Sequence, residues 1–280
     1  MTFSYHEPTT WVAAHELIAR EPEATVLAGG TAFMLMLRQG LIRPSSVVSL
    51  RRVPEATAIR ADAHGGLSIG AMATHTAVVM SPLVRKTWPE FAEAAAKVAT
   101  LRIRNQATIG GSVAHADPAS DVPVMLAALG AQALVRSGAG TRRVPIDELL
   151  VDTFTTSLAA DELIQSIEIP ARGRYTRAVY LKFTLRSVDD YATVSVAARA
   201  DIAQGYVNAP RIFLGAVGPR PMRARSVESA IVEDSKDPRP DAEALVRSDI
   251  DPIDDIRGSA EYKREMARVL TRRALRALYA

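Results

Sequence analysis

Residues 104–121 of the chain read RNQATIGGSVAHADPASD and contain a glycine pair, Gly110-Gly111, between an isoleucine and Ser112. A similar pair, Gly29-Gly30, follows an apolar stretch and precedes Thr31. Because glycine has no Cβ, successive N–H groups in such a segment can approach an anion closely and form a concave binding site. Two such segments that face each other would suit a pyrophosphate, with the two hydroxyls as further donors.

The same glycine pairs have a simpler interpretation as tight turns, which Gly-Gly dipeptides usually mark. Neither segment matches the G-x-G-x-x-G fingerprint or the G-x-x-x-x-G-K-[ST] phosphate loop. After the second pair, Asp117 or Ser120 is expected to cap a following helix, whereas Asp121 lies a turn further on and could accept hydrogen bonds from a ligand. The residues alone leave both a phosphate site and two ordinary turns open.

The composition is that of an ordinary globular protein with a sizeable core: 280 residues, 48% hydrophobic and 23% charged. Lysine plus arginine (34) nearly balance aspartate plus glutamate (31), and only 5% of residues are aromatic. Single-strand nucleic-acid binders use aromatic stacking platforms. We therefore expect no nucleic-acid partner.

The chain has no cysteine, which excludes disulfides and cysteine-bound iron–sulfur or zinc sites within it. The histidines are scattered, and His15-Glu16 is not followed by a second histidine at metalloprotease spacing, so no metal site is expected. No apolar run approaches the roughly 20 residues of a membrane helix. Residues 1–8 lack the basic-then-apolar pattern of a signal peptide, which predicts a cytoplasmic location.

The pattern of apolar residues predicts a mixture of strands and helices in two parts. The first part alternates strands and helices, and the turn signal Pro170–Gly173 indicates a domain boundary. Antiparallel strands and two helices are expected after it. The predicted helices are Thr10–Arg20, Ala32–Arg38, Leu83–Ala99, Pro118–Leu129, Ser226–Val232 and Glu261–Leu278, and the predicted strands are Thr25–Ala28, Val47–Leu50, Leu67–Ile69, Ala133–Val135, Arg142–Val144, Ile164–Ile169, Ala178–Phe183, Thr193–Ala200 and Arg211–Val217.

Five motifs follow one another along the whole chain: Leu27–Thr31, Ile69–Thr74, Arg104–Ser112 with Ala116–Asp121, Tyr180–Phe183 with Arg186 and Asp189–Ala192, and Arg257–Lys263 with Arg272–Ala274. In this order they resemble the medium, FAD-binding subunit of the xanthine dehydrogenase and carbon monoxide dehydrogenase family of molybdenum hydroxylases.

Two departures from the family pattern concern the flavin's environment. Ser112 stands where the family commonly has asparagine, and Thr31 where some members have histidine. Both keep a hydrogen-bonding side chain beside a glycine pair. The cysteines of the branch that binds an extra cluster are absent, so that branch is not indicated.

The resemblance implies an FAD-binding domain of the vanillyl-alcohol oxidase (PCMH) type, made of two subdomains, over residues 1–172. It implies a smaller α+β domain of the carbon monoxide dehydrogenase flavoprotein C-terminal type over residues 173–280. Residues 26–33 and 108–112 are implied to hold the FAD pyrophosphate, mostly through backbone amides. Asp121 would bind a polar group in the adenosine or ribityl part.

Lys182 is implied to lie at the polar edge of the flavin ring, where its charge would stabilise the anionic reduced form. Tyr191 would cover one face of the ring, and His115 occupies a variable position in the motif. No catalytic or metal-binding residue is implied. The implied FAD-binding residues are Val26, Leu27, Ala28, Gly29, Gly30, Thr31, Ala32, Phe33, Val98, Thr108, Ile109, Gly110, Gly111, Ser112, Asp121, Ile164, Lys182 and Tyr191.

The function implied by the resemblance is electron relay. A large partner subunit with molybdopterin would oxidise the substrate, a small partner with [2Fe–2S] clusters would carry the electrons, and FAD in this chain would pass them to NAD, a quinone or oxygen. Two rivals are a stand-alone FAD-dependent oxidoreductase, which needs a general base near the flavin, and a flavin-free binding or scaffold protein on the same fold.

Overall fold

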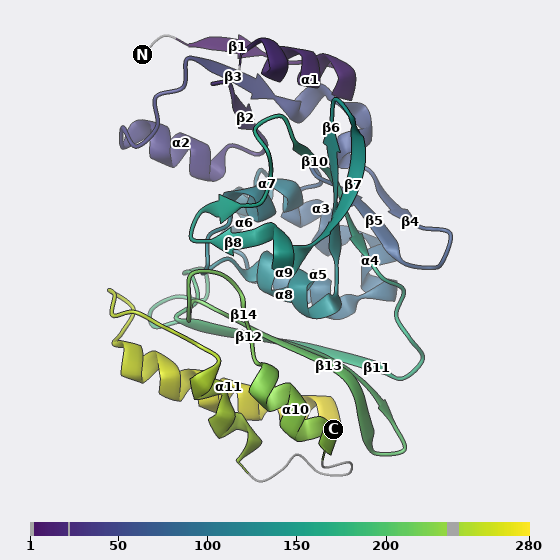
Figure 1. The fold of residues 1–280 in the computed structure, drawn as a ribbon, viewed down its shortest axis with the longest axis vertical. Coiled ribbons are helices and arrows are strands. Elements are labelled where there is room, and N and C mark those ends of the chain that lie inside the picture. The colour runs from purple at the N-terminus through teal and green to yellow at the C-terminus, as the bar shows by residue number, and fades with distance from the viewer. Residues whose placement is uncertain (1–2, 22, 234–240) are drawn as a thin grey trace.

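The computed structural model describes residues 3–21, 23–233 and 241–280, arranged in three parts stacked along the long axis of the molecule (Figure 1). The first part is a parallel sheet of order β1-β3-β2 with two helices. A cluster of buried apolar side chains, which includes Trp11, Ile18 and Val48, fills its interior. Its elements are β1 (Ser4–His6), α1 (Trp11–Arg20), β2 (Thr25–Leu27), α2 (Thr31–Arg38) and β3 (Ser46–Ser49).

The middle part is an antiparallel sheet of order β4-β5-β10-β6-β7 packed against helices. Its strands are β4 (Ile59–Ala61), β5 (Leu67–Gly70), β6 (Gln132–Ser137), β7 (Gly140–Pro145) and β10 (Leu163–Ile169), beside a hairpin of β8 (Leu150–Asp152) and β9 (Thr155–Thr156). Its helices are α3 (His75–Met80), α4 (Pro82–Thr87), α5 (Pro89–Ala96), α6 (Leu101–Arg104), α7 (Ile109–His115), α8 (Asp121–Leu129) and α9 (Ile146–Leu149).

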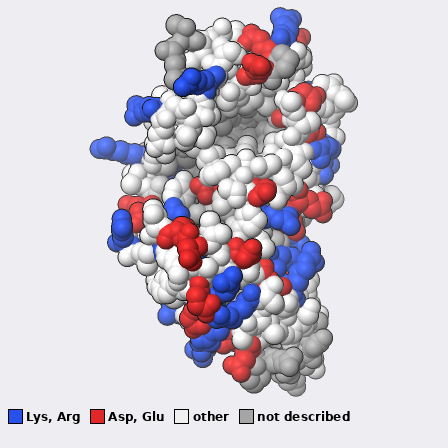
Figure 2. All heavy atoms as spheres, turned by 60° about the vertical axis from the view of Figure 1, so that its left-hand side comes forward, with Lys and Arg blue, Asp and Glu red and all other residues white. Residues whose placement is uncertain are grey.

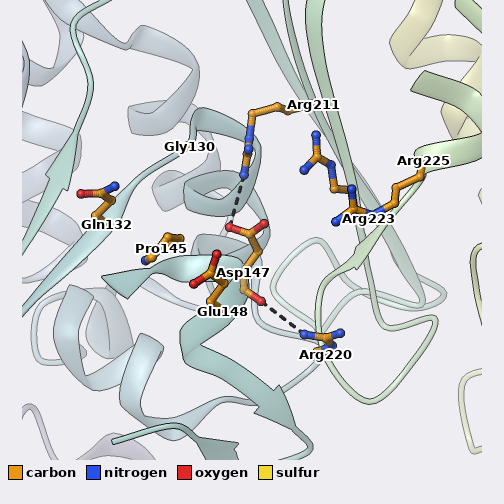
Figure 3. Close-up of a pocket in the computed structure, with 9 residues that line it drawn as sticks. All are labelled: Gly130, Gln132, Pro145, Asp147, Glu148, Arg211, Arg220, Arg223 and Arg225. Atoms are coloured by element: carbon orange, nitrogen blue, oxygen red, sulfur yellow. Dashed lines mark hydrogen bonds and ion pairs between the residues drawn. The ribbon is translucent and has the colours of Figure 1, made fainter. Parts of the chain in front are cut away.

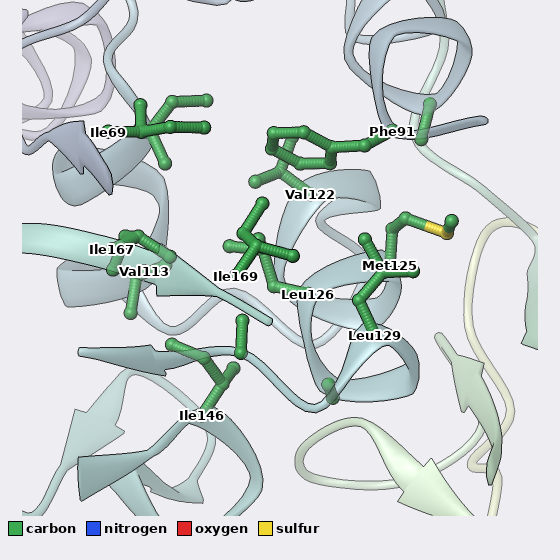
Figure 4. Close-up of a cluster of buried hydrophobic side chains, with 14 of the residues drawn as sticks. Ile69, Phe91, Val113, Val122, Met125, Leu126, Leu129, Ile146, Ile167 and Ile169 are labelled. Atoms are coloured by element: carbon green, nitrogen blue, oxygen red, sulfur yellow. The ribbon is translucent and has the colours of Figure 1, made fainter. Parts of the chain in front are cut away.

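Helix α8 is the centre of the molecule, because all nine of its residues are buried. A helix that is apolar on every side must be covered on every side. On one side its Val122 and Leu126 lie in the same cluster as Ile167 of β10 (Figure 4). The C-terminal sheet covers another side.

The C-terminal part is an antiparallel sheet of order β11-β12-β13-β14 with two helices. Alternate residues of a strand point to opposite faces, and both faces here are apolar. Val196 and Leu214 pack beneath the helices, whereas Ala197 and Phe213 join the cluster around α8. The elements are β11 (Thr176–Phe183), β12 (Val194–Ala203), β13 (Tyr206–Gly215), β14 (Met222–Arg223), α10 (Arg225–Glu233) and α11 (Ala260–Tyr279).

The predicted α+β class in these parts is confirmed, and two predicted helices are wrong in extent. The helix expected over Leu83–Ala99 is two helices, α4 and α5, because Pro89 lacks an N–H and starts a new helix after Trp88. The helix expected from Pro118 begins at Asp121. The predicted boundary at residue 172 falls between β10 and β11 and stays a prediction. Within the described residues, no helix is long and apolar enough to cross a membrane.

Arginines of the C-terminal part face the middle part across a polar pocket of about 410 Å³ (Figure 3). Arg211 donates from Nε and Nη2 to the carbonyl oxygen of Ala127, at 3.1 and 3.0 Å, and its Nη2 lies 3.3 Å from Asp147 Oδ1. The last carbonyls of a helix lack N–H partners within it, so an arginine is well placed there. Arg220 bonds the carbonyl oxygens of Asp147 and Leu150. These contacts fix the C-terminal sheet against α8 and α9.

We expect Arg211→Ala to lower the free energy of unfolding by about 2 kcal/mol, because it leaves the half-buried Asp147 carboxylate without its arginine partner and removes two of the hydrogen bonds to the Ala127 carbonyl. Urea unfolding followed by circular dichroism would measure this. Arg247→Ala is the matched control, since it removes a more exposed pair with Glu261 and should cost less than about 1 kcal/mol. Equal losses in the two variants would contradict the importance given to Arg211.

Candidate cofactor site

A cavity of about 870 Å³ opens where the three parts meet, within the size range of small-molecule and cofactor sites. The face in Figure 2 is hollowed there, and most atoms around the hollow belong to neither acidic nor basic residues. Every residue predicted to bind FAD lines this cavity except Ile109. Ile109 is fully buried in the core around α8 instead.

The first glycine segment supplies free backbone donors at the N-terminus of α2. Gly30 adopts a left-handed conformation with φ +76° and caps α2 without a side-chain hydrogen bond. The first N–H groups of a helix have no intrahelical partner, and the helix dipole favours negative charge near them. Residues Thr31, Ala32 and Phe33 therefore offer an anion site at the cavity wall.

The second glycine segment does not form a comparable nest of free N–H groups, so that interpretation is wrong for it. Gly110 N–H donates to the Ala71 carbonyl at 2.8 Å, and Gly111 N–H donates to Thr108 Oγ1, which caps α7, at 3.1 Å. The glycines serve close packing instead. A Cβ on Gly110 would lie 2.5 Å from the Cβ of Ala71.

The two glycine segments touch each other. A Cβ on Gly29 would lie 1.9 Å from the carbonyl oxygen of Gln106, and one on Gly111 would lie 3.2 Å from the Cβ of Ala28. At Gly29 the neighbouring atoms are all backbone atoms. The cavity floor therefore depends on the absence of a side chain at residue 29.

Asp121 and Lys182, predicted separately as cofactor contacts, form a buried ion pair at the cavity wall. Lys182 Nζ lies 2.9 Å from Asp121 Oδ2, and both side chains are only 5% exposed. Tyr180 donates its hydroxyl to Asp121 Oδ1 at 2.5 Å. Burial raises the pKa of the Asp121 carboxyl, while the Lys182 ammonium and the Tyr180 hydroxyl act in the opposite direction.

Lys97 completes this network and was missed from the sequence, as was Tyr180. Lys97 Nζ donates to the Tyr180 carbonyl at 3.0 Å, and Lys182 Nζ donates to the Lys97 carbonyl at 2.8 Å. The two lysines thus join the end of α5 to β11. A signal for Tyr180 existed, because residues 180 and 182 of one strand point to the same face.

Tyr191 stands at the mouth of the cavity, 49% exposed. The Arg257 guanidinium lies 5.5 Å from its ring centroid. Burial raises the pKa of the Tyr191 hydroxyl, and the nearby Asp117 carboxylate raises it further.

Asp117 does not cap α8; it accepts from Ala119 N–H in the preceding turn at 2.9 Å. The predicted apolar contacts Val98 and Ile164 line the same cavity.

Of three aromatic residues in the wall, His75 and Phe154 were missed from the sequence, and His115 was given no role. His75 Nε2 lies 2.9 Å from Ser112 Oγ, and His75 is fully buried. Burial, with the Arg104 charge as a second cause, lowers the pKa of His75 to about 4. His115 packs on Phe154, with ring centroids 5.0 Å apart.

Among the described residues, no group of three or more histidine or acidic side chains could hold a metal ion.

Two family models match the chain. The model for the FAD binding domain in molybdopterin dehydrogenase matches residues 1–172, and the model for the CO dehydrogenase flavoprotein C-terminal domain matches residues 179–278.

Relatives of known name match over nearly their full length. The glyceraldehyde dehydrogenase medium chain of Sulfolobus acidocaldarius is 31% identical, over 98% of this chain and 97% of its own. The nicotine 6-hydroxylase medium subunit of Paenarthrobacter nicotinovorans is 34% identical, with 97% and 95% covered. A chain in the crystal structure of carbon monoxide dehydrogenase from Hydrogenophaga pseudoflava superposes with a TM-score of 0.94 at 32% identity, over 100% of this chain and 98% of that one.

We expect Gly29→Ala to disrupt the cavity, because the added Cβ would lie 1.9 Å from the Gln106 carbonyl oxygen, and a backbone atom cannot turn aside as the end of a flexible side chain can. The free energy of unfolding should fall by about 2 kcal/mol or more. Thermal unfolding would measure it. Gly138→Ala is the matched control, since no atom lies within 4 Å of the added Cβ, and it should leave stability unchanged. A stable Gly29→Ala variant would refute the tight contact between the segments.

His75 should make the chain acid-sensitive. Its pKa of about 4 in the folded state lies below its ordinary value of 6.5, so only the unfolded chain gains a proton between these values. Above pH 6.5 the protonation of His75 does not lower the free energy of unfolding. As the pH falls from 6.5 through 4, this free energy decreases by up to about 3 kcal/mol. Urea unfolding at pH 7 and pH 4.5 should show a smaller loss for His75→Gln than for the parent. His64→Gln, at an exposed position, should leave the pH dependence unchanged.

Proposed function

Because the chain belongs to the family of FAD-binding medium subunits of molybdenum hydroxylases, and is thus an oxidoreductase subunit, we propose that it relays electrons within a larger complex. A small subunit with [2Fe–2S] clusters delivers electrons that a large molybdenum-cofactor subunit takes from the substrate. FAD bound in this chain supplies the link between one-electron and two-electron transfer, and an external acceptor such as NAD, a quinone or oxygen receives the electrons.

One observation carries the proposal: both glycine segments and the Asp121–Lys182 pair open into a single cavity of cofactor size. Its apolar walls suit the flat rings of FAD, and the α2 N-terminus suits its pyrophosphate. Ser112 supplies a hydroxyl from the facing segment. These features support the assignment of residues 26–33 and of the Ser112 hydroxyl to the pyrophosphate, whereas the N–H groups of the second segment bond within the protein.

Lys182 is proposed to place a fixed positive charge beside the flavin ring. Its ammonium is held by Asp121 and by the Lys97 carbonyl, so it cannot swing away into water. A charge held in position before the reaction stabilises a developing negative charge without reorganisation. Tyr191, half-exposed at the mouth, is proposed to cover the ring and limit access from solvent.

The site favours relay over a stand-alone oxidoreductase. A general base needs a pKa near the working pH and contact with the substrate. His75, the cavity's most buried histidine, has a pKa of about 4, and burial lowers the pKa of His115 as well. The rival of a flavin-free scaffold is disfavoured because a cavity of cofactor size persists between the glycine segments.

We further propose that residues 1–172 form the FAD-binding domain and residues 173–280 the C-terminal domain. The break between β10 and β11 supports this division. Lys182 and Tyr191 line the same cavity as the glycine segments, which supports a cofactor held by both domains. A cytoplasmic location is also proposed for the complex.

The test of the proposal is the FAD content of the purified chain, measured by absorption and by chromatography of heat-released cofactor. We expect about one FAD per chain and no reduction of the flavin by organic substrates without the partner subunits. Chain that stays colourless after reconstitution with excess FAD would refute the site. Rapid reduction of the flavin by an organic substrate in the isolated chain would favour the stand-alone rival.

Lys182→Met should weaken FAD binding by at least about tenfold, because it removes the fixed charge and leaves Asp121 buried without a counter-ion. Flavin fluorescence during titration of the apoprotein would measure this. Lys86→Met, at an exposed position on α4, is the matched control and should not change the affinity. Unchanged affinity in Lys182→Met would remove Lys182 from the site.

A further inference from the structure

His75 stands directly behind Ser112 at the wall of the cavity. It is the first residue of α3, and its backbone N–H donates to the Ala107 carbonyl at 3.0 Å. Its Nε2 lies 2.9 Å from Ser112 Oγ. His75 is fully buried, whereas Ser112 is partly exposed and lines the cavity. Any ligand that reaches Ser112 is thus one hydrogen bond from the imidazole.

The second imidazole nitrogen has no partner. Within the described part of the chain, His75 Nδ1 is buried and makes no hydrogen bond. A neutral imidazole carries one N–H donor and one acceptor nitrogen. Buried N–H groups without a partner are rarer than acceptors without one. The favoured tautomer therefore keeps the proton on Nε2 and leaves Nδ1 as the unpaired acceptor.

This tautomer decides how Ser112 can act. With Nε2–H donating to Ser112 Oγ, the serine oxygen accepts from the imidazole, and its own hydrogen is free to point into the cavity. In the opposite tautomer, the hydroxyl would donate to His75 and present only lone pairs to the ligand. Lone pairs repel an anionic oxygen, whereas an O–H group binds it.

We infer that His75 is a positioning residue that fixes the Ser112 hydroxyl as a donor to an anionic, diphosphate-type oxygen of the bound cofactor. The inference rests on the proposed function and adds to it a residue that does not itself contact the cofactor. It also explains how a serine can act as a donor at residue 112. A hydroxyl can donate or accept, and the imidazole leaves it free to donate, whereas the NH₂ group of an asparagine is always a donor.

The test is a double-mutant cycle on FAD affinity, with ADP as a second probe that keeps the diphosphate and lacks the flavin. Ser112→Ala and His75→Leu should each weaken both ligands by about tenfold, the size of one charge-assisted hydrogen bond. The double variant should be no weaker than either single one. His75→Gln, whose amide can donate to Ser112, should stay within about threefold of the parent.

His115→Leu is the control, because His115 lines the same cavity but packs on Phe154 rather than Ser112. The fold-loss of affinity in His115→Leu combined with Ser112→Ala should equal the product of the two single losses. Independent, multiplying effects of His75→Leu and Ser112→Ala would overturn the inference, as would a His75→Gln variant as weak as His75→Leu. If the leucine variant does not fold, ¹⁵N NMR of the parent decides: a proton on Nδ1 instead of Nε2 overturns it.

A parent chain that binds neither FAD nor ADP would instead refute the proposed function. Binding that is insensitive to both His75 and Ser112 would refute only the inference about this pair. The two failures are therefore distinguishable in one set of titrations.

Discussion

The contact between the two glycine segments is the constraint on which the rest of the site depends. Gly29 rests on the backbone of Gln106, and Gly110 rests on Ala71, at distances that leave no room for a Cβ. This contact brings the N-terminus of α2 and the start of α7 to one wall. Residues nearly eighty positions apart thereby line one cavity.

Much of this arrangement could be predicted from the sequence, because glycine pairs and a strand-helix rhythm are local signals. The place of the cavity followed from the motifs around Gly29 and Gly110. The free N–H donors could not be predicted in the same way, because hydrogen-bond partners such as Ala71 come from remote positions. Only the fold shows that the N–H groups of the second segment bond within the protein. Only the first segment has the free N–H donors that the two motifs predicted for both segments.

The polar network around Asp121 lay beyond local patterns for the same reason. Lys97 and Tyr180 are separated by 83 residues, and nothing near either one predicts that an ammonium will meet a carbonyl. His75 likewise reads as an ordinary residue at the start of a short helix. The break of the predicted helix Leu83–Ala99 is different, because Pro89 is itself a local signal that a new helix starts there.

The wall of the cavity is composite, and this affects the order in which the molecule is completed. Both glycine segments and Asp121 precede residue 122, whereas Lys182 and Tyr191 belong to β11 and the loop after it. β11 becomes part of a stable sheet only when it pairs with β12, and that sheet needs α11 to cover it. During synthesis, α11 leaves the ribosome after β11 and β12. The nascent chain therefore displays a half-built site until α11 has emerged, and retention of the cofactor reports that both halves of the wall have folded.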